Sequence, residues 1–184
     1  YWPTMIINRK IILSAVFTAL AVSMGYLFLL IPNVEMISAT VFIAGAVVGP
    51  VYGLFIGLSA ALLFSLLNPM GAAAPPLLIA QLMCFMLIGF VGGLVGLPAK
   101  ERLWQKSLLY GLCGFLLTMI YDLLTTLSFA VFIAAEDPKK FATIFASGIT
   151  FYVTHSVVNT IIFMTIVPAA LFGIRRYQLS KNYA

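Results

Sequence analysis

Charge is what this sequence has least of. Only 8% of its 184 residues are Asp, Glu, Lys or Arg, whereas 63% are hydrophobic and the mean hydropathy is +1.13. A water-soluble globule of this size needs more polar surface than these residues can supply. The composition therefore argues against a soluble globular protein and predicts an integral membrane protein.

Residues and motifs that carry chemistry are equally scarce. The sequence has one histidine and two cysteines, Cys84 and Cys113, whose spacing fits neither a metal site nor a disulfide. It contains no glycine loop ending in Gly-Lys-Ser/Thr, no Gly-x-Ser-x-Gly turn and no His-Glu-x-x-His motif. We therefore expect no enzymatic activity, no metal site and no intrinsic cofactor. Any energy from ATP would have to come from partner proteins.

Long apolar runs fill most of the chain instead. A helical crossing of the bilayer needs about 20 apolar residues. Four runs meet that length: 11–31, 77–97, 107–134 and 141–174. A fifth run, 37–67, is interrupted by Gly49-Pro50, and a proline inside a helix removes a backbone hydrogen bond. That run is either one kinked helix or two short ones.

The positions of Lys and Arg favour two helices, because cytoplasmic loops collect these residues. With two helices in the fifth run, eight Lys and Arg fall on the side of both termini and only Lys139 and Lys140 fall on the other. With one helix, the split is six to four. We therefore predict an all-α fold of six transmembrane helices, with cytoplasmic N and C termini and a single domain over 1–184. The basic loops would then face membrane lipids, and no nucleic acid is needed to explain them.

A few polar side chains interrupt the apolar runs or fill the short loops between them. Polar residues inside a membrane face a cavity or a partner group more often than lipid. On the predicted topology these residues could line a pocket that opens outward. The candidate binding residues are Asn33, Glu35, Asn68, Gln81, Cys84, Asp122, Thr125, Thr126, His155 and Asn159. Aromatic side chains at similar depths could stack on a flat ligand: Tyr121, Phe129, Phe151 and Tyr152.

Several of these candidates have a structural interpretation that stays open. Asp122 suits a hydrogen bond to a neighbouring helix as well as it suits ligand binding. His155 and Asn159, spaced by four on one helical face, fit interior residues as well as ligands. Cys84 is typical of a small buried residue, and the alternative is a soft ligand to a metal-containing substrate.

Small residues recur at intervals of four. Ala15 and Ala19, with Ser23 one turn on, form a flat stripe along which another helix can approach closely. Glycines recur in the same way within 45–57 and 89–96. Internal packing is the favoured interpretation for the glycines, whereas the alanine stripe suits packing and partner docking equally.

Taken together, these features resemble the substrate-binding S component of an energy-coupling factor (ECF) vitamin transporter. The resemblance rests on six predicted helices, a short second helix, Ala15-x-x-x-Ala19, and an Asn-Val-Glu turn at 33–35. It implies a protein of the bacterial cytoplasmic membrane that binds a water-soluble vitamin. It further implies docking through Ala15 and Ala19 on a T component powered by two ATPase subunits, and delivery of the vitamin by toppling in the membrane. The turn is similar to that of a subgroup associated with cobalamin or related corrinoids, for which Cys84 would suit as a cobalt ligand.

Two other classes of function remain open. A self-sufficient proton-coupled carrier would use Asp122 and His155 as a proton relay. A structural membrane subunit would use the polar residues as hydrogen bonds between helices. Secondary transporters usually contain inverted repeats, and the two halves of this sequence show no convincing repeat.

Overall fold

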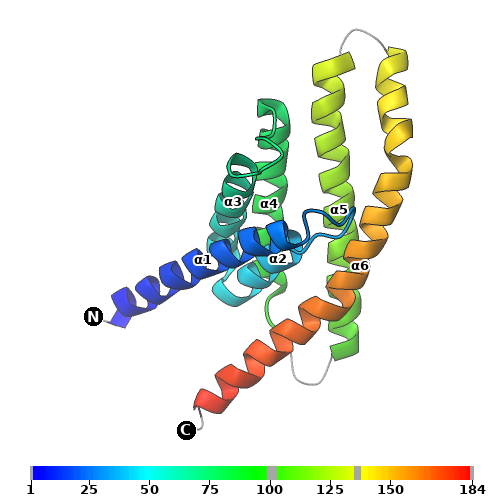
Figure 1. Ribbon diagram of the computed structural model, residues 1–184. Helices are drawn as coiled ribbons and strands as arrows, with labels where there is room; N and C mark the ends of the chain where they lie inside the picture. Colours follow the sequence, from blue (N-terminus) through cyan, green and yellow to red (C-terminus); the bar gives the residue numbers. More distant parts are fainter. Residues whose placement is uncertain (1, 99–102, 135–137, 183–184) are drawn as a thin grey trace.

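The computed structural model describes residues 2–98, 103–134 and 138–182. Over these residues the chain forms six helices, and the described part contains no strand (Figure 1). The helices are α1 (Trp2–Leu27), α2 (Ile37–Val48), α3 (Pro50–Leu66), α4 (Pro75–Val95), α5 (Leu103–Ala134) and α6 (Pro138–Asn182). The predicted all-α fold of six helices is confirmed. Parts of two predicted loops, 99–102 and 135–137, lie outside the described residues, and the cytoplasmic termini and single domain stay predictions.

Gly49 and Pro50 separate α2 from α3, as the charge distribution predicted. Gly49 has a φ of +104°, a conformation that residues with a Cβ rarely adopt. Its N–H closes the last turn of α2 on the carbonyl of Gly45 at 2.8 Å. Pro50 then begins α3 at the first helical position, where its missing N–H would have had no intrahelical partner.

The helices differ in their reach across a membrane. Four apolar stretches are long enough to cross it: Asn8–Leu27, Pro75–Val95, Lys106–Val131 and Lys139–Tyr177. The other two helices, α2 and α3, have 12 and 17 residues. At 1.5 Å per residue α2 is about 18 Å long, well short of the roughly 30 Å of the hydrocarbon core. Every residue of α2 except Val47 is buried, so this short helix lies at the centre of the molecule.

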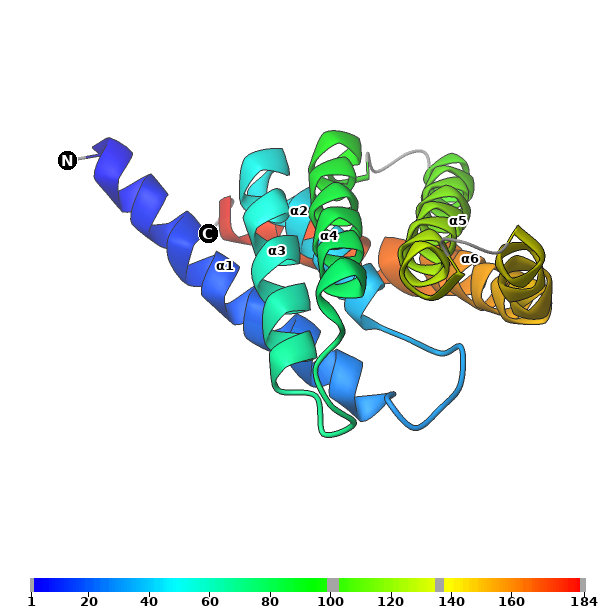
Figure 2. The same ribbon diagram turned by 90° about the horizontal axis from the view of Figure 1, so that it is seen from above.

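The six helices form two groups (Figures 1 and 2). In the first group, α1 to α4, the central helix α2 contacts α1, α3 and α4. In the second group, α5 and α6 pack side by side as a long antiparallel hairpin. Contacts between the groups are fewer and run mainly from α4 to α5 and from α2 to α6.

Two hydrogen bonds hold the hairpin to the first group at one end of the molecule. The hydroxyl of Tyr110, near the start of α5, donates to the carbonyl of Gly96 at 3.0 Å. The guanidinium of Arg175, near the end of α6, donates to the carbonyl of Pro98. Both bonds tie the hairpin to the chain that follows α4.

The helix α6 changes direction along its length (Figure 1). It contains Pro168, which cannot donate the hydrogen bond to the preceding turn.

Glycines allow α2, α3 and α4 to approach until their backbones touch. A Cβ at Gly45 or Gly53 would collide with the carbonyl oxygen of Gly89, and a Cβ at Gly89 would collide with that of Gly53. The same kind of collision with a facing backbone would occur at Gly57 and Gly92. The predicted role of these glycines in internal packing is confirmed.

Unlike these buried glycines, the alanine stripe of α1 lies on the surface of the molecule. Ala15, Ala19 and Ser23 are exposed, whereas Ala21 and Gly25 on another face of the helix are buried. Within the described part of the chain, the stripe is therefore not used for packing.

Candidate functional site

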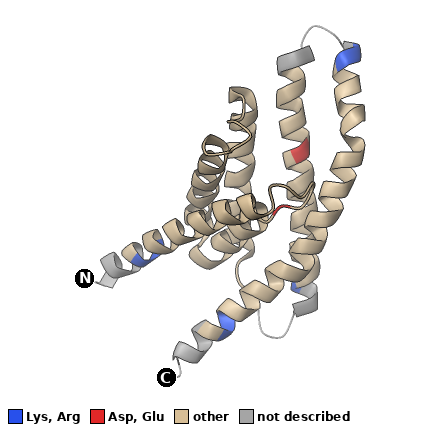
Figure 3. Cartoon of the chain, in the orientation of Figure 1, with Lys and Arg blue, Asp and Glu red and all other residues tan. Residues whose placement is uncertain are grey.

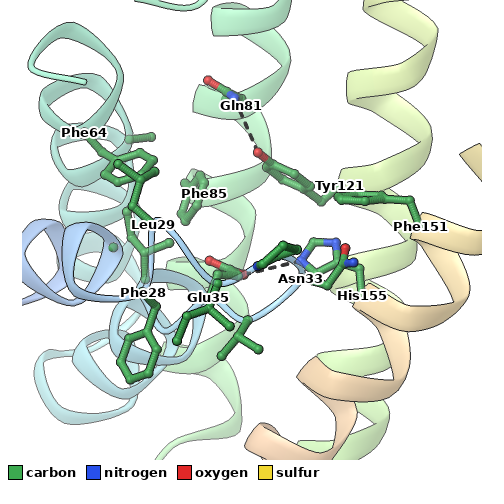
Figure 4. Close-up of a pocket in the computed structure, with 16 residues that line it drawn as sticks. Phe28, Leu29, Asn33, Glu35, Phe64, Gln81, Phe85, Tyr121, Phe151 and His155 are labelled. Carbon is green, nitrogen blue, oxygen red and sulfur yellow. Dashed lines mark hydrogen bonds and ion pairs between the residues drawn. The ribbon is translucent and has the colours of Figure 1, made fainter. Parts of the chain in front are cut away.

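A cavity of about 250 Å³ lies between the two groups of helices (Figure 4). One wall consists of the end of α1, the connection to α2, and residues of α3 and α4, and the other consists of residues of α5 and α6. Most of the lining is apolar: Phe28, Leu29, Ile31, Val34, Ile37, Phe64, Phe85 and Phe151. Five polar residues also line it: Asn33, Glu35, Gln81, Tyr121 and His155. A mostly apolar hollow with a few converging polar groups is typical of a small-molecule site.

The imidazole of His155 lies between two carboxylates. Its Nδ1 is 2.8 Å from Oδ1 of Asp122, and its Nε2 is 3.9 Å from Oε1 of Glu35. Because a carboxylate only accepts hydrogen bonds, we assign the hydrogen of this pair to Nδ1, which donates to Asp122. Asp122 on α5, His155 on α6 and Glu35 before α2 are thus brought together, but only Glu35 and His155 line this cavity.

Asn159 connects the same groups from behind the cavity. Its Nδ2 lies 3.1 Å from each of three atoms: Oε1 of Glu35, Nε2 of His155 and Oγ1 of Thr118. The spacing of four places Asn159 one turn from His155 on α6, so the predicted shared face is correct. Thr118 was not among the candidates. Its spacing of four from Asp122 on α5 is the sequence signal that could have identified it.

Glu35 reaches the cavity from the loop before α2, and its side chain is 26% exposed. Its Oε2 accepts a hydrogen bond from the N–H of Ser38 at 3.3 Å, near the positive end of the α2 dipole. Burial alone would raise the pKa of Glu35. The contact with His155 and the hydrogen bonds from Ser38 and Asn159 outweigh burial and hold this pKa below its usual value of 4.5. Glu35 is therefore ionised at neutral pH.

Asn33 lines the cavity two residues before Glu35 (Figure 4). It has a φ of +60° and is the one non-glycine residue with positive φ in the described chain. Asparagine tolerates this left-handed conformation better than most residues. Its Oδ1 is buried and has no hydrogen-bond donor among the described residues.

A second cavity, of about 300 Å³, lies between α5 and the first half of α6. Asp122, Thr125 and Thr126 line it, so these three predicted residues are brought together there. The hydroxyl of Tyr152 is 2.7 Å from that of Thr126 and also belongs to the lining. Phe151 lines both cavities, so the two share one wall.

The predicted aromatic residues lie at these cavities. Tyr121 and Phe151 line the first, while Phe129 and Tyr152 line the second. The hydroxyl of Tyr121 accepts a hydrogen bond from Nε2 of Gln81 at 3.3 Å, and its ring packs edge-on at 6.1 Å from that of His155. Three further aromatics were missed: Phe28, Phe64 and Phe85. Phenylalanine in an apolar run has no sequence signal that distinguishes a cavity from lipid.

Three predicted residues line neither cavity: Asn159, which lies behind the first cavity, and Asn68 and Cys84. Oδ1 of Asn68 accepts a hydrogen bond from the N–H of Met70 at 2.9 Å, within the turn that follows α3. Cys84 is 2% exposed in α4, and both it and Cys113 are free thiols. Among the described residues, no cluster of three or more His, Cys, Asp and Glu side chains could hold a metal ion.

The sequence also matches a known family. Residues 9–171 match the family model described as "ECF transporter, substrate-specific component". This range contains every residue that lines either cavity. No curated protein and no solved structure matches the chain.

Proposed function

Because the chain belongs to the family of substrate-specific components of ECF transporters, we propose that it binds a small water-soluble vitamin or vitamin precursor in the first cavity. This family consists of transporter components and is not an enzyme family. It implies a multi-pass membrane protein that takes a small-molecule substrate and associates with a T component and ATPases. The observation that carries the proposal is the cavity itself, where Glu35, Asn33 and His155 converge within an aromatic lining.

The size of the cavity limits the class of vitamin. At about 30 Å³ per water molecule, a volume of about 250 Å³ holds the equivalent of about eight waters or one small organic ring system. A corrinoid is several times larger, and Cys84, which would suit a cobalt ion, lines neither cavity. The volume therefore favours a small vitamin or precursor over cobalamin.

Delivery would follow the route that the family resemblance implies. The exposed Ala15 and Ala19 would dock on the T component, which two ATPase subunits power, and the protein would topple within the bacterial cytoplasmic membrane. The termini would face the cytoplasm. The outward orientation of the stripe on α1 supports this part of the proposal.

The test is binding by the purified protein in detergent. Thermal unfolding would be followed with a panel of water-soluble vitamins, and hits confirmed by calorimetry. A ligand at 100 times its Kd should stabilise the protein by about 2.7 kcal/mol. His155→Ala and Asn159→Ala should weaken binding, whereas Thr165→Val should not, because Thr165 is exposed on the same helix and bonds only to the Ile161 carbonyl. If no vitamin stabilises the protein and native mass spectrometry finds no co-purified molecule, the proposal fails.

The short contact between Asp122 and His155 also suits a proton relay, as a self-sufficient carrier would require. The two functions differ in their need for partners. Uptake into liposomes that depends on a proton gradient, with no other protein present, would favour the carrier. Uptake that requires the T component and ATP would favour the proposed function.

A further inference from the structure

Hydrogen-bond acceptors exceed donors around the two cavities. Three buried side-chain atoms in the described part of the chain have no hydrogen-bond partner, and all three are oxygens: Asn33 Oδ1, Asp122 Oδ2 and Asn159 Oδ1. Asp122 and Asn159 are 2% and 1% exposed. Buried acceptors normally have donors, because leaving one unpaired is costly. Asn33 lines the first cavity and Asp122 lines the second, so a molecule in these cavities is the natural source of the missing donors.

The neighbours of Asn159 fix the orientation of its amide. Nδ2 faces the carboxylate of Glu35, which cannot donate, so turning the amide would place Oδ1 against an anion. Nδ2 lies 3.1 Å from Oε1 of Glu35, Oγ1 of Thr118 and Nε2 of His155. Oδ1 of Asn159 is thereby left without a donor in the network behind the cavity.

Acidic side chains also outnumber basic ones in this region. The described carboxylates, Glu35 and Asp122, lie in the middle of the molecule, whereas the described Lys and Arg lie toward the ends of the helices (Figure 3). No described residue that lines either cavity is Lys or Arg. Among the described residues that line either cavity, the one basic side chain is His155, and it lies beside both of these carboxyl groups.

We propose that the ligand of this site is a small organic cation with N–H donors, such as an aromatic ring that carries a protonated amine or amidine. This inference rests on the proposed function and names the chemical class of its substrate. Asn33 and Glu35 face the cation in the first cavity, and Asp122 acts on it through His155. The rings of Tyr121, Phe85 and Phe151 pack against the flat part of the ligand, and aromatic faces also attract cations. An anionic ligand would instead add a like charge beside Glu35 and Asp122.

Three probes of the same shape test the inference: benzamidinium, benzamide and benzoate. They place a cation, a neutral amide and an anion on the same ring, and they lose N–H donors in that order. Affinities would be measured by calorimetry or by saturation-transfer NMR on the wild-type protein and on Glu35→Gln, Asp122→Asn and Thr165→Val. Benzamidinium should bind at least about tenfold more tightly than benzoate. Glu35→Gln should reduce this preference by roughly tenfold, Asp122→Asn by less, and Thr165→Val should leave it unchanged.

The ranking in the wild-type protein decides the outcome even if a variant fails to fold. Binding of benzamide or benzoate as tight as that of benzamidinium overturns the inference, and so does a complete lack of benzamidinium binding. A preference that survives in both carboxylate variants overturns it as well, because the cation would then bind elsewhere. In each of these cases a vitamin that binds in the panel leaves the proposed function intact. Failure of the whole vitamin panel would instead remove the proposed function.

Discussion

The two groups of helices are held by different kinds of contact. In the first group, α2, α3 and α4 meet at glycines, backbone against backbone, with little room for adjustment. In the second group and across the cavity, buried polar side chains add to the apolar packing of α5 and α6: Thr118, Asp122, His155, Ser156 and Asn159. A backbone contact has one geometry, whereas a hydrogen bond can exchange its partner for a ligand. The difference indicates that the first group is a scaffold, and it supports the proposal that a ligand binds at the polar side.

The largest expected effect comes from breaking the glycine contact. Gly89→Val would place a branched side chain against the carbonyl of Gly53, and the facing backbone cannot move aside without separating α3 from α4. We expect a loss of more than about 3 kcal/mol in the free energy of unfolding. Thermal unfolding in detergent, followed by circular dichroism, measures it.

The matched control for this change is Gly173→Ala. A Cβ at Gly173 meets nothing within 4 Å, so the alanine should be neutral or stabilise α6 by up to about 1 kcal/mol. If Gly89→Val unfolds at the wild-type temperature, the first group is not the rigid scaffold that its contacts indicate.

The next largest effect should come from removing the side-chain amide of Asn159, which contacts Glu35, His155 and Thr118. Asn159→Ala leaves Glu35, His155 and Thr118 without a shared donor, and should cost about 1–3 kcal/mol of stability. Thr165→Val on the same helix should change the free energy of unfolding by no more than about 0.5 kcal/mol.

A double-mutant cycle of Asn159→Ala with Glu35→Gln should show non-additive effects, because the two side chains share one hydrogen bond. Additive effects would mean that the network does not couple the loop to α6.

A smaller effect should come from Glu35→Gln, which removes the charge of this side chain but keeps its shape. Glu35→Gln should lower the unfolding temperature at pH 7, and the difference from wild type should shrink in acid. The folded pKa of Glu35 lies below 4.5, so the stability from its ionised form is present above the unfolded pKa and is lost as the pH falls through the folded pKa. Unfolding temperatures of both proteins between pH 7 and about pH 3 measure this. A constant difference over that range would show that the charge contributes nothing.

The smallest effect on the chain itself is expected at the stripe on α1. The double variant Ala15→Leu, Ala19→Leu adds bulk to exposed positions, and should change the free energy of unfolding by no more than about 0.5 kcal/mol. Ligand affinity should also be unchanged, while co-purification with the T component should be lost. Val16→Leu, at an exposed position beside the stripe, is the control. Retained docking in the double variant would place the partner surface elsewhere.

The sequence predicted the fold better than the site. Proline chemistry and the placement of Lys and Arg were enough to separate α2 from α3 at Gly49-Pro50. The central position of α2 could not be predicted, because an apolar run looks the same whether it faces lipid or other helices.

Within the site, spacing identified the shared face of His155 and Asn159, because residues four apart on a helix are neighbours. Their contact with Glu35 could not be predicted, since Asn159 and Glu35 are 124 residues apart and meet only through the path of the loop before α2. Asn68 was expected in the pocket, but a polar side chain that follows a helix can be satisfied within its own turn.

The hydrogen bonds from Tyr110 to Gly96 and from Arg175 to Pro98 attach the α5–α6 hairpin to the first group at one of its ends. These bonds lie beside the C-terminal end of α4, and the hairpin extends away from them to the end of α5 and the start of α6 (Figure 1). In a rigid rotation of the hairpin about these two bonds, the displacement of each residue grows with its distance from them. Asp122 and His155 would move less than the end of α5 and the start of α6. If ligand binding turns the hairpin about these two bonds, a label on the first turn of α6 should therefore move farther than one beside the ligand.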